Sequence, residues 1–461
     1  MGDTRSTKPV TQVLSGGCLE WRRVHCEWAN VCVSLSLTSW VGKSFKRPPT
    51  ATEWGRFRKY ARRMRELRAY CTPCVLSLEV LSVLQTRTVN EPLLPNLKAL
   101  HLWGVDGPLF PFVPLFLSPR TTFIFFRFND PDLPKAMAAS IVTTFPRLCP
   151  DLQAINIQLP TDPMITAAVS EMVLTTNRNA LQKFVVDCPL TDEAREVVYT
   201  LPNLHDLSVA IEKETSLPSA SLPNLTKITI KCEDEGDWPR LFHGASLGKL
   251  ESVTFYPQSE EEIGDFLGAF ERAALSSSLQ NTLSKFHVRP LCSWNPNYSP
   301  LLPFTQLVEL TIGSRCGVDC SSRVDDDIII DLSRAMPKLK ILELGYDPCR
   351  ESTMGVTANG LLALALHCPN LLSLSIHFQV AGLITLPARP GIGPDAGPTG
   401  SWTDCALTNL TVGRIPMPEE SVLMAASALL RIFPRIENIF STEGEWGEVE
   451  EIIQTNSRFF K

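Results

Sequence analysis

Leu201-Pro-Asn-Leu204-His-Asp-Leu207-Ser-Val209 contains the pattern that decides the fold of this chain. Its second half, Leu204-x-x-Leu207-x-Val209, is a frame of apolar residues that returns along most of the sequence. Clear copies begin at Leu97, Leu204, Leu225, Leu250, Leu307, Leu339 and Leu371, and weaker copies begin at Met64, Phe123, Leu152, Leu181, Leu283, Leu407 and Ile436. A frame that recurs fourteen times, at a spacing of roughly 20 to 36 residues, is typical of a leucine-rich solenoid.

Each copy of the frame predicts a short β-strand with one buried face. Apolar residues alternate with polar or small ones, as in Leu207-Ser208-Val209-Ala210, and a period of two is the period of a strand. A single short strand cannot bury its leucines alone, so neighbouring copies are expected to stack and to pair in parallel. Every strand of the predicted sheet would then present a second set of side chains on its outward face.

Helical periodicity fills the segments between the strands. One apolar stripe at helical spacing contains Met164, Ile165, Ala168, Val169, Met172 and Val173. Helix starts are indicated by Asp162 before Pro163, by Thr191 and by Asp325. Proline follows four helical runs, at Pro146, Pro337, Pro369 and Pro434, where it disfavours continuation.

These patterns predict an α/β leucine-rich-repeat solenoid, with about fourteen irregular strand–helix repeats, a curved parallel sheet and a short helical N-terminal cap. Residues 1–60 would form an N-terminal helical segment and linker, and residues 61–440 the solenoid. Residues 441–461 would form a C-terminal capping helix, because Glu448–Phe460 has helical spacing and a polar face. The Pro- and Gly-rich stretch 386–400 is expected to be an exposed loop, either simply irregular or a partner-binding insertion.

Composition bears on the compartment. The chain has 461 residues, 44% of them hydrophobic, and a net charge of -6. Fourteen cysteines would suit a secreted protein, but residues 1–20 contain no apolar run that could act as a signal peptide, so a reducing, cytoplasmic or nuclear location is expected. Cys149, Cys188 and Cys368 are expected to be small buried plugs of the repeats. No membrane span is expected, because the most apolar region, Leu109–Phe128, is broken by prolines and arginines.

Motifs that could carry chemistry lack the context that the chemistry needs. Gly244-Ala-Ser246-Leu-Gly248 matches a hydrolase nucleophile elbow, but a repeat strand follows it where an elbow needs a helix. The pairs Cys71/Cys74 and Cys316/Cys320 have no second pair of matching spacing to complete a zinc site. Asp325-Asp326-Asp327 is better explained by helix capping than by calcium binding. We therefore expect a protein that is not an enzyme, with no catalytic residue, no cofactor and no metal.

One segment resembles a known family. Residues 35–69 contain Trp40, then Pro48-Pro49-Thr50, then Trp54-x-x-Phe57-x-x-Tyr60-Ala61-x-x-Met64-x-x-Leu67. This stretch is similar to the junction in fungal F-box proteins where the end of the F-box passes through a proline–threonine linker into leucine-rich repeats. The opening Leu-Pro-x-Glu helix of an F-box is absent, and Thr11–Cys32 matches its later helices only loosely, so the F-box is incomplete or degenerate.

The resemblance implies a substrate receptor of a cullin-type ubiquitin ligase. Residues 18–45 would dock the ligase adaptor, with Trp28, Leu35 and Trp40 as the contact residues. The alternative is a stand-alone leucine-rich-repeat scaffold without ligase association, which the missing Leu-Pro-x-Glu start favours.

The same entry segment is basic. Residues 1–68 carry fourteen Lys and Arg against five Asp and Glu, and the rest of the chain is acidic. A nucleic-acid site is one interpretation of the cluster between Lys43 and Arg68. A solvated helix face, or a face docking on an acidic partner, agrees better with Trp54, Phe57 and Tyr60, whose spacing indicates a buried stripe. We expect neither nucleic acid nor membrane as a partner.

The outward face of the sheet is the expected binding surface for a protein target, because solenoids bind through the concave side of their sheet. Aromatic and cationic groups of the kind enriched at binding hot spots are expected there. The residues assigned to this surface are Trp103, Arg127, Tyr256, His287, Arg289 and His377.

Overall fold

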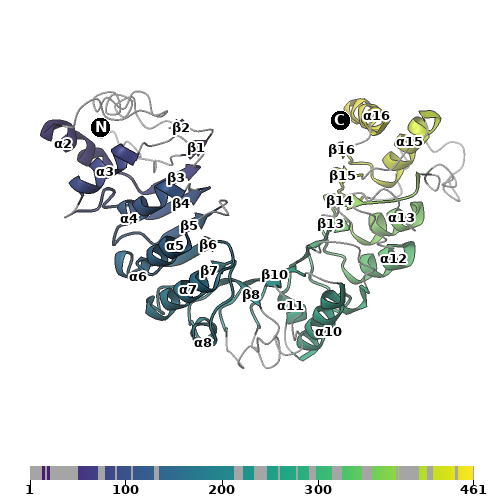
Figure 1. Cartoon of the computed structure of the whole chain (residues 1–461). Helices are drawn as coiled ribbons and strands as arrows, with labels where there is room; N and C mark the ends of the chain where they lie inside the picture. The colour runs from purple at the N-terminus through teal and green to yellow at the C-terminus, as the bar shows by residue number, and fades with distance from the viewer. Residues whose placement is uncertain are drawn as a thin grey trace, which may run out of the picture. The chain divides into compact units, whose positions relative to one another are not determined.

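The computed structural model describes residues 13–15, 18–20, 50–70, 78–88, 91–104, 107–128, 134–211, 222–232, 247–257, 260–276, 279–289, 297–313, 324–344, 356–380, 383, 404–412, 419–441 and 445–459. The chain divides into two compact units, Met1–Ala210 and Ile211–Lys461, called here the first and the second unit. Each unit is built mainly from parallel strands and the helices that connect them (Figure 1).

The first unit contains strands β1 to β8. Their bounds are β1 Val13–Ser15, β2 Cys18–Glu20, β3 Glu66–Tyr70, β4 Ala99–Trp103, β5 Phe123–Arg127, β6 Ala154–Gln158, β7 Lys183–Val186 and β8 Asp206–Ile211. Its helices are α2 Ala51–Ala61, α3 Leu78–Arg87, η1 Gly107–Phe112, α4 Val113–Phe116, α5 Lys135–Val142, α6 Phe145–Leu148, α7 Pro163–Thr175 and α8 Asp192–Tyr199. From β3 to β8 each strand pairs in parallel with the next.

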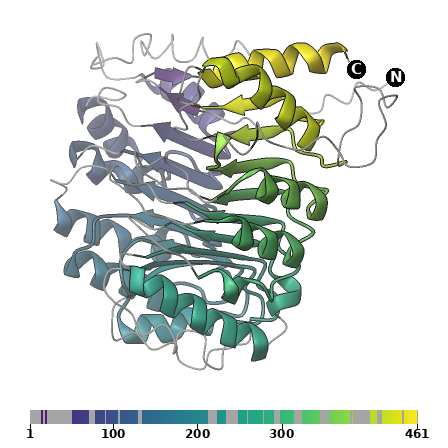
Figure 2. The same ribbon diagram turned by 90° about the vertical axis from the view of Figure 1, so that its right-hand side faces the viewer.

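The second unit contains strands β9 to β16. Their bounds are β9 Lys227–Cys232, β10 Ser252–Tyr256, β11 Lys285–Val288, β12 Glu309–Ile312, β13 Ile341–Leu344, β14 Ser373–Ile376, β15 Asn409–Thr411 and β16 Asn438–Phe440. Its helices are α10 Glu260–Ser276, α11 Leu279–Thr282, η2 Ser299–Leu301, α12 Asp326–Ala335, α13 Ala358–His367, η3 Glu419–Ser421, α15 Val422–Ile432 and α16 Glu445–Phe459. All these strands pair in parallel, and Figure 2 shows them side by side from teal β10 to yellow β16.

Helices cover one face of the sheet in each unit (Figure 1). Burial alternates along the strands: in β10, Val253 and Phe255 are buried while Ser252, Thr254 and Tyr256 are half-exposed. The buried residues are the apolar positions of the repeated frame, so the core lies between strands and helices. The other face, called here the open face, has no helix over it among the described residues. The structure therefore confirms the predicted α/β architecture, with parallel strands and a second set of side chains on the outward face.

The core of the second unit is reinforced by phenylalanines from α10. Phe266 stacks on Phe255 of β10 with ring centroids 3.9 Å apart, and Phe270 contacts Phe286 of β11 and Phe304 at 5.4 and 4.9 Å. All five rings are fully buried. Aromatic pairs at these separations add to the free energy gained by burying their area.

Helix boundaries follow the predicted signals. The side chains of Asp162, Thr191 and Asp325 each accept a backbone N–H at the start of α7, α8 and α12. Helices α12, α13 and α15 end just before Pro337, Pro369 and Pro434, as expected. Pro146 differs, because it lies in the first turn of α6, where proline needs no N–H partner.

Three expectations need correction. The repeat assigned to Phe123 begins two residues earlier, because the strand register aligns Ala99 with Phe123, which makes Thr121 the equivalent of Leu97. Met164 does not belong to the buried stripe of α7; it is 50% exposed, whereas the next residue, Ile165, is fully buried. Residues 54, 57 and 60 of α2 are half-buried rather than buried, with Trp54 and Phe57 stacked on each other at 5.1 Å.

The N-terminal segment was expected to be helical, but its first described residues are strands. β1 pairs in parallel with β3, through Val13 and Arg68, and β2 returns antiparallel to β1. An edge strand such as β3 can pair with a further strand through its backbone groups, and β1 occupies that place. In the sequence, Gly16-Gly17 stands between β1 and β2, and this dipeptide is favoured in tight hairpins. Among the described residues of this segment, α2 is helical and begins with a capping box of Thr50 and Glu53.

Buried thiols occur as the repeat pattern predicts. Cys149, Cys188 and Cys368 are buried, and so are Cys232 and Cys405; all five carry a thiol rather than a disulfide. Burial raises the pKa of Cys149 and of Cys368 to about 12, so these thiols stay protonated at neutral pH. In the described part of the chain, no helix is both long enough and apolar enough to cross a membrane.

Candidate functional site

The second unit has a hollow of about 540 Å³ on its open face. It lies over β9, β10, β11 and β12 and is called here the β10 hollow. Its lining consists of Thr226, Lys227, Thr229, Glu251, Ser252, Thr254, Tyr256, Ser284, Lys285, His287, Arg289 and Glu309. Hydroxyl and charged groups therefore dominate the lining, and Tyr256 is its one aromatic ring apart from His287.

The strand register arranges these residues in rows across the sheet. Because side chains two apart on a strand share a face, equivalent positions of neighbouring parallel strands lie side by side. The first row is Lys227, Ser252, Lys285 and Glu309, the second is Thr229, Thr254, His287 and Thr311, and the third contains Lys231, Tyr256 and Arg289. Arg289 continues the ladder, since its backbone N–H donates to the Phe255 carbonyl at 2.9 Å.

Tyr256 lies between two cations in the third row. The Nζ atom of Lys231 is 5.7 Å from the centre of the Tyr256 ring, and the Cζ atom of Arg289 is 5.9 Å from it. A cation within about 6 Å of an aromatic ring is attracted by the negative face of the ring. These contacts hold two long basic side chains beside the ring and keep their charges at the surface.

Glu309 organises the other end of the hollow. One of its carboxylate oxygens is 2.9 Å from the Nζ atom of Lys285, and the other is 3.6 Å from Nε2 of His287. Burial lowers the pKa of His287 below its usual value of 6.5; Glu309 opposes this shift, and Arg289, Lys285 and Lys227 add to it. His287 is consequently neutral at pH 7, and the contact with Glu309 is a polar one between a neutral ring and a carboxylate.

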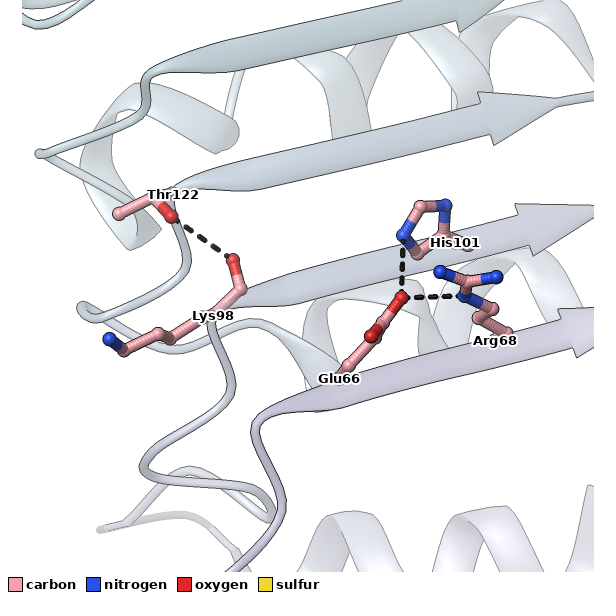
Figure 3. Close-up of polar contacts among 5 residues, drawn as sticks. All are labelled: Glu66, Arg68, Lys98, His101 and Thr122. Atoms are coloured by element: carbon pink, nitrogen blue, oxygen red, sulfur yellow. Dashed lines mark hydrogen bonds and ion pairs between the residues drawn. The ribbon is translucent and has the colours of Figure 1, made fainter. Parts of the chain in front are cut away.

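The first unit carries a second cluster on its open face, called here the His101 cluster. Glu66 of β3 accepts a hydrogen bond from Nε of Arg68 at 2.5 Å, and its same oxygen is 3.3 Å from Nε2 of His101 on β4 (Figure 3). Beside this polar group, the Thr122 hydroxyl donates to the Lys98 carbonyl at 3.3 Å where β5 approaches β4. Burial lowers the pKa of His101, against the opposing effect of Glu66.

Aromatic rings extend the His101 cluster along β4 and β5. The His101 ring lies 4.7 Å from Phe123 and 6.1 Å from Phe125, and Trp103 stacks on Phe125 at 4.8 Å. All four rings are half-buried, so the cluster presents an apolar surface with one carboxylate–guanidinium pair at its border.

The six residues expected to bind a partner fall into three places. Tyr256, His287 and Arg289 lie together in the β10 hollow. Trp103 and Arg127 are neighbours across β4 and β5 in the first unit, with Trp103 half-buried and Arg127 exposed. His377 lies just after β14 and is only 5% exposed, so its expected place on an accessible surface is wrong. Burial lowers the pKa of His377 as well.

Lys227, Lys285 and Glu309 belong to the β10 hollow but were not expected as site residues. Each occupies the outward position of its strand frame, directly before a buried apolar residue, so the alternation does place it on the open face. The missing information was the register, which decides which outward residues become neighbours.

Other expected features lie outside the described residues. These are the adaptor-binding residues Trp28, Leu35 and Trp40, the loop 386–400, Ser246, the Cys71/Cys74 pair and the Cys316/Cys320 pair. Within the described ranges, no group of three or more His, Cys, Asp or Glu residues is placed to hold a metal ion.

Compared with models of known protein families, the sequence matches none. Compared with curated proteins, it also finds no match.

Proposed function

We propose that this chain is a non-catalytic leucine-rich-repeat protein that recognises a protein partner through the open face of its parallel sheet. The observation that carries the proposal is the β10 hollow, where Tyr256 lies between Lys231 and Arg289 on a sheet face that the described helices leave uncovered. Tyrosine and arginine are enriched among the residues that dominate the binding energy of protein interfaces.

Two further features support the leucine-rich-repeat assignment. Every strand from β3 to β16 lies on one copy of the repeated frame, and the apolar positions of the frame are buried under helices. Repeats of this kind cannot bury their apolar face alone and are stabilised by their neighbours. The polar positions between them are then free to vary and to specify a partner.

The resemblance to fungal F-box proteins extends the proposal to a biological role. In that role the protein is the substrate receptor of a cullin-type ubiquitin ligase in the cytoplasm or nucleus. Trp28, Leu35 and Trp40 would contact the ligase adaptor, and the repeats would hold the target. The second candidate is a stand-alone scaffold, which is favoured by the absence of a Leu-Pro-x-Glu motif from the stretch that resembles the F-box.

Co-purification separates these two roles. A tagged full-length chain is expressed in cells from which other F-box proteins recover adaptor and cullin. Recovery of both supports the receptor role, and recovery of a target protein without them supports the scaffold. Proximity labelling with the same chain identifies the target for the binding experiments below.

The open-face proposal is tested by changing Tyr256 and Arg289 to Ala together. Both side chains point away from the core, so we expect the thermal unfolding temperature to stay nearly unchanged while binding of the target weakens by tenfold or more, as for a loss of about 2 kcal/mol at a hot spot. Leu207→Ala is the contrasting variant, because Leu207 is fully buried and its truncation should cost about 2 to 5 kcal/mol of stability.

Calorimetry of unfolding and titration with the purified target check both expectations. An open-face double variant that unfolds while Leu207→Ala does not would mean that the two sheet faces are interchanged. A double variant that is stable and still binds at full affinity would remove the β10 hollow from the interface.

A further inference from the structure

The β10 hollow has a regular distribution of charge. Two cationic residues on the β9 side and two on the β11 side flank β10, whose own outward residues are uncharged. Lys227, Lys285 and Arg289 line the hollow, and Lys231 lies next to it, beside Tyr256. Neighbouring strands are about 4.8 Å apart and alternate residues about 6.8 Å apart along a strand. The Cα atoms of these four residues therefore stand near the corners of a rectangle of roughly 10 by 14 Å, with the hydroxyl groups of β10 along its middle.

The cations differ in how far they are already neutralised. Lys285 is held by Glu309 at 2.9 Å. Lys227 and Arg289 are both exposed, and neither enters an ion pair among the described residues. The Arg289 side chain is held in place by the Tyr256 ring, which its guanidinium faces, and its backbone N–H donates a hydrogen bond to β10. The hollow thus retains positive charge on both sides of its middle row.

Hydroxyl groups complete a site for a carboxylate. Thr229 and Thr254 lie in the middle row between the two pairs of cations, beside His287. A carboxylate accepts hydrogen bonds through both oxygens and is recognised by hydroxyl, lysine and arginine donors. An extended peptide repeats its side-chain direction at about 6.8 Å, the same interval as the rows of the hollow.

We infer that the β10 hollow binds an acidic, extended segment of the protein partner, with carboxylate side chains received by Lys227, Arg289 and the threonines of the middle row. The inference rests on the proposed function and names the chemistry that the open face selects.

The charge of the hollow favours carboxylates over phosphorylated residues. Glu251 and Glu309 line the same hollow, so an incoming anion meets two negative charges as well as the cations. The lining also carries three positive charges, on Lys227, Lys285 and Arg289, so its excess is one positive charge. One carboxylate neutralises this excess, whereas a phosphorylated side chain, with about two negative charges at pH 7, exceeds it. The uncharged middle row supplies the hydroxyl groups of Thr229 and Thr254, which can donate hydrogen bonds to the oxygens of one carboxylate.

The experiment uses the full-length chain and fluorescently labelled oligoglutamate, oligoglutamine and phosphoserine peptides of equal length, in an anisotropy titration. Lys227→Gln/Arg289→Gln removes two charges from the hollow. Arg272→Gln/Arg334→Gln is the matched control, because it removes two charges from exposed residues of α10 and α12 on the helical side of the same unit.

The oligoglutamate peptide is expected to bind and the oligoglutamine peptide not to bind. The hollow variant should weaken oligoglutamate binding about three- to tenfold, as for the loss of two exposed charge interactions, and the control variant should leave it unchanged. Binding should also weaken as salt is raised, since exposed charges are screened.

Three results would overturn the inference: no oligoglutamate binding, equal weakening by both double variants, or tighter binding of the phosphoserine peptide. Failure here is distinguishable from failure of the proposed function. If oligoglutamate does not bind but Tyr256→Ala/Arg289→Ala still loses the purified target, the open face remains the interface and only its preference for acidic segments is wrong.

Discussion

Thr121 occupies a position where most repeats of this chain carry leucine. It is fully buried, and its hydroxyl donates to the Leu97 carbonyl at 3.2 Å and accepts the Ser118 N–H at 3.1 Å. The Ser118 hydroxyl is also buried and lies 3.2 Å from the same carbonyl. A buried hydroxyl is tolerated when its hydrogen bonds are made. A search for apolar residues misses this threonine, which is why the copy was placed two residues late, at Phe123.

His377 gives a residue-scale prediction about pH. Its burial lowers its pKa in the folded state below the value of about 6.5 that it has when unfolded. Between these two pKa values the unfolded chain binds more protons than the folded one, so the free energy of unfolding falls as the pH falls below 6.5. Above pH 6.5 the His377 ring is neutral in both the folded and the unfolded chain, so the free energy of unfolding is no longer reduced by protonation of His377.

The prediction is checked by urea unfolding at pH 7.5 and pH 5.5, in the original chain and in His377→Gln. The pKa values of His101 and His287 are lowered too, but both residues remain in both proteins, so their effect cancels in the difference. We expect the stability advantage of the original chain over His377→Gln to shrink on acidification. A difference that does not depend on pH would show that His377 is not buried as described.

Sequence patterns predict burial well for residues in the middle of the repeated frame and poorly at its ends. Leu207, Val253 and Leu342 are buried as the alternation requires. Met164 lies in the first turn of α7 and His377 directly after β14, at the ends of these elements, where periodicity no longer fixes the direction of a side chain. Their exposure depends on the next element of the fold, which periodicity does not identify.

At the scale of elements, Asp326 joins two consecutive helices of the second unit. It is the first residue of α12, yet its carboxylate accepts N–H groups from Thr357 at 2.7 Å and Gly360 at 3.1 Å, at the start of α13. It also accepts the Thr357 hydroxyl at 2.6 Å. A carboxylate here satisfies N–H groups that have no partner within the helix and complements the helix dipole. Asp325 meanwhile caps α12 itself, so two neighbouring aspartates serve two helices.

The contact between the Asp326 carboxylate and the start of α13 requires a glycine at position 360. A Cβ atom on Gly360 would lie 2.7 Å from the Asp326 carboxylate and 3.1 Å from Val356, so alanine must displace the carboxylate from α13. We expect Gly360→Ala to cost about 1 to 3 kcal/mol of stability, through the loss of hydrogen bonds to a charged group.

Gly264→Ala is the matched control. Gly264 lies inside α10, and nothing stands within 4 Å of where its Cβ would be. Alanine favours a helix interior over glycine by about 0.5 to 1 kcal/mol, so this variant should be slightly stabilised. Urea unfolding of both variants measures the contrast, and equal stability of the two would contradict the role given to Asp326.

Local signals predicted the helix starts, because an N-cap acts within one turn. Asp162, Thr191 and Asp325 were identified in this way. The link from Asp326 to α13 spans more than thirty residues and has no local signal. The strands β1 and β2 were missed for the same reason, since their pairing depends on the edge of β3, far along the chain.

At the scale of the molecule, each unit presents a different surface on its open face. The His101 cluster of the first unit is aromatic, with Trp103, Phe123 and Phe125 beside one polar group. The β10 hollow of the second unit is cationic and rich in hydroxyl groups. Alternation along each strand predicted that such side chains face outward. Their grouping required the strand register, which sets Lys227, Ser252 and Lys285 side by side although they are far apart in the sequence.

The open face, and not the helical face, is expected to receive the partner. The most direct measurement introduces a photo-crosslinking amino acid at one position on each face and irradiates the protein with its purified target. Thr254 stands in the middle of the β10 hollow, and Leu366 of α13 is 55% exposed on the helical side of the same unit. We predict a crosslink to the target from position 254 and none from position 366. A crosslink from position 366 alone, or equal yields from both positions, would contradict the account.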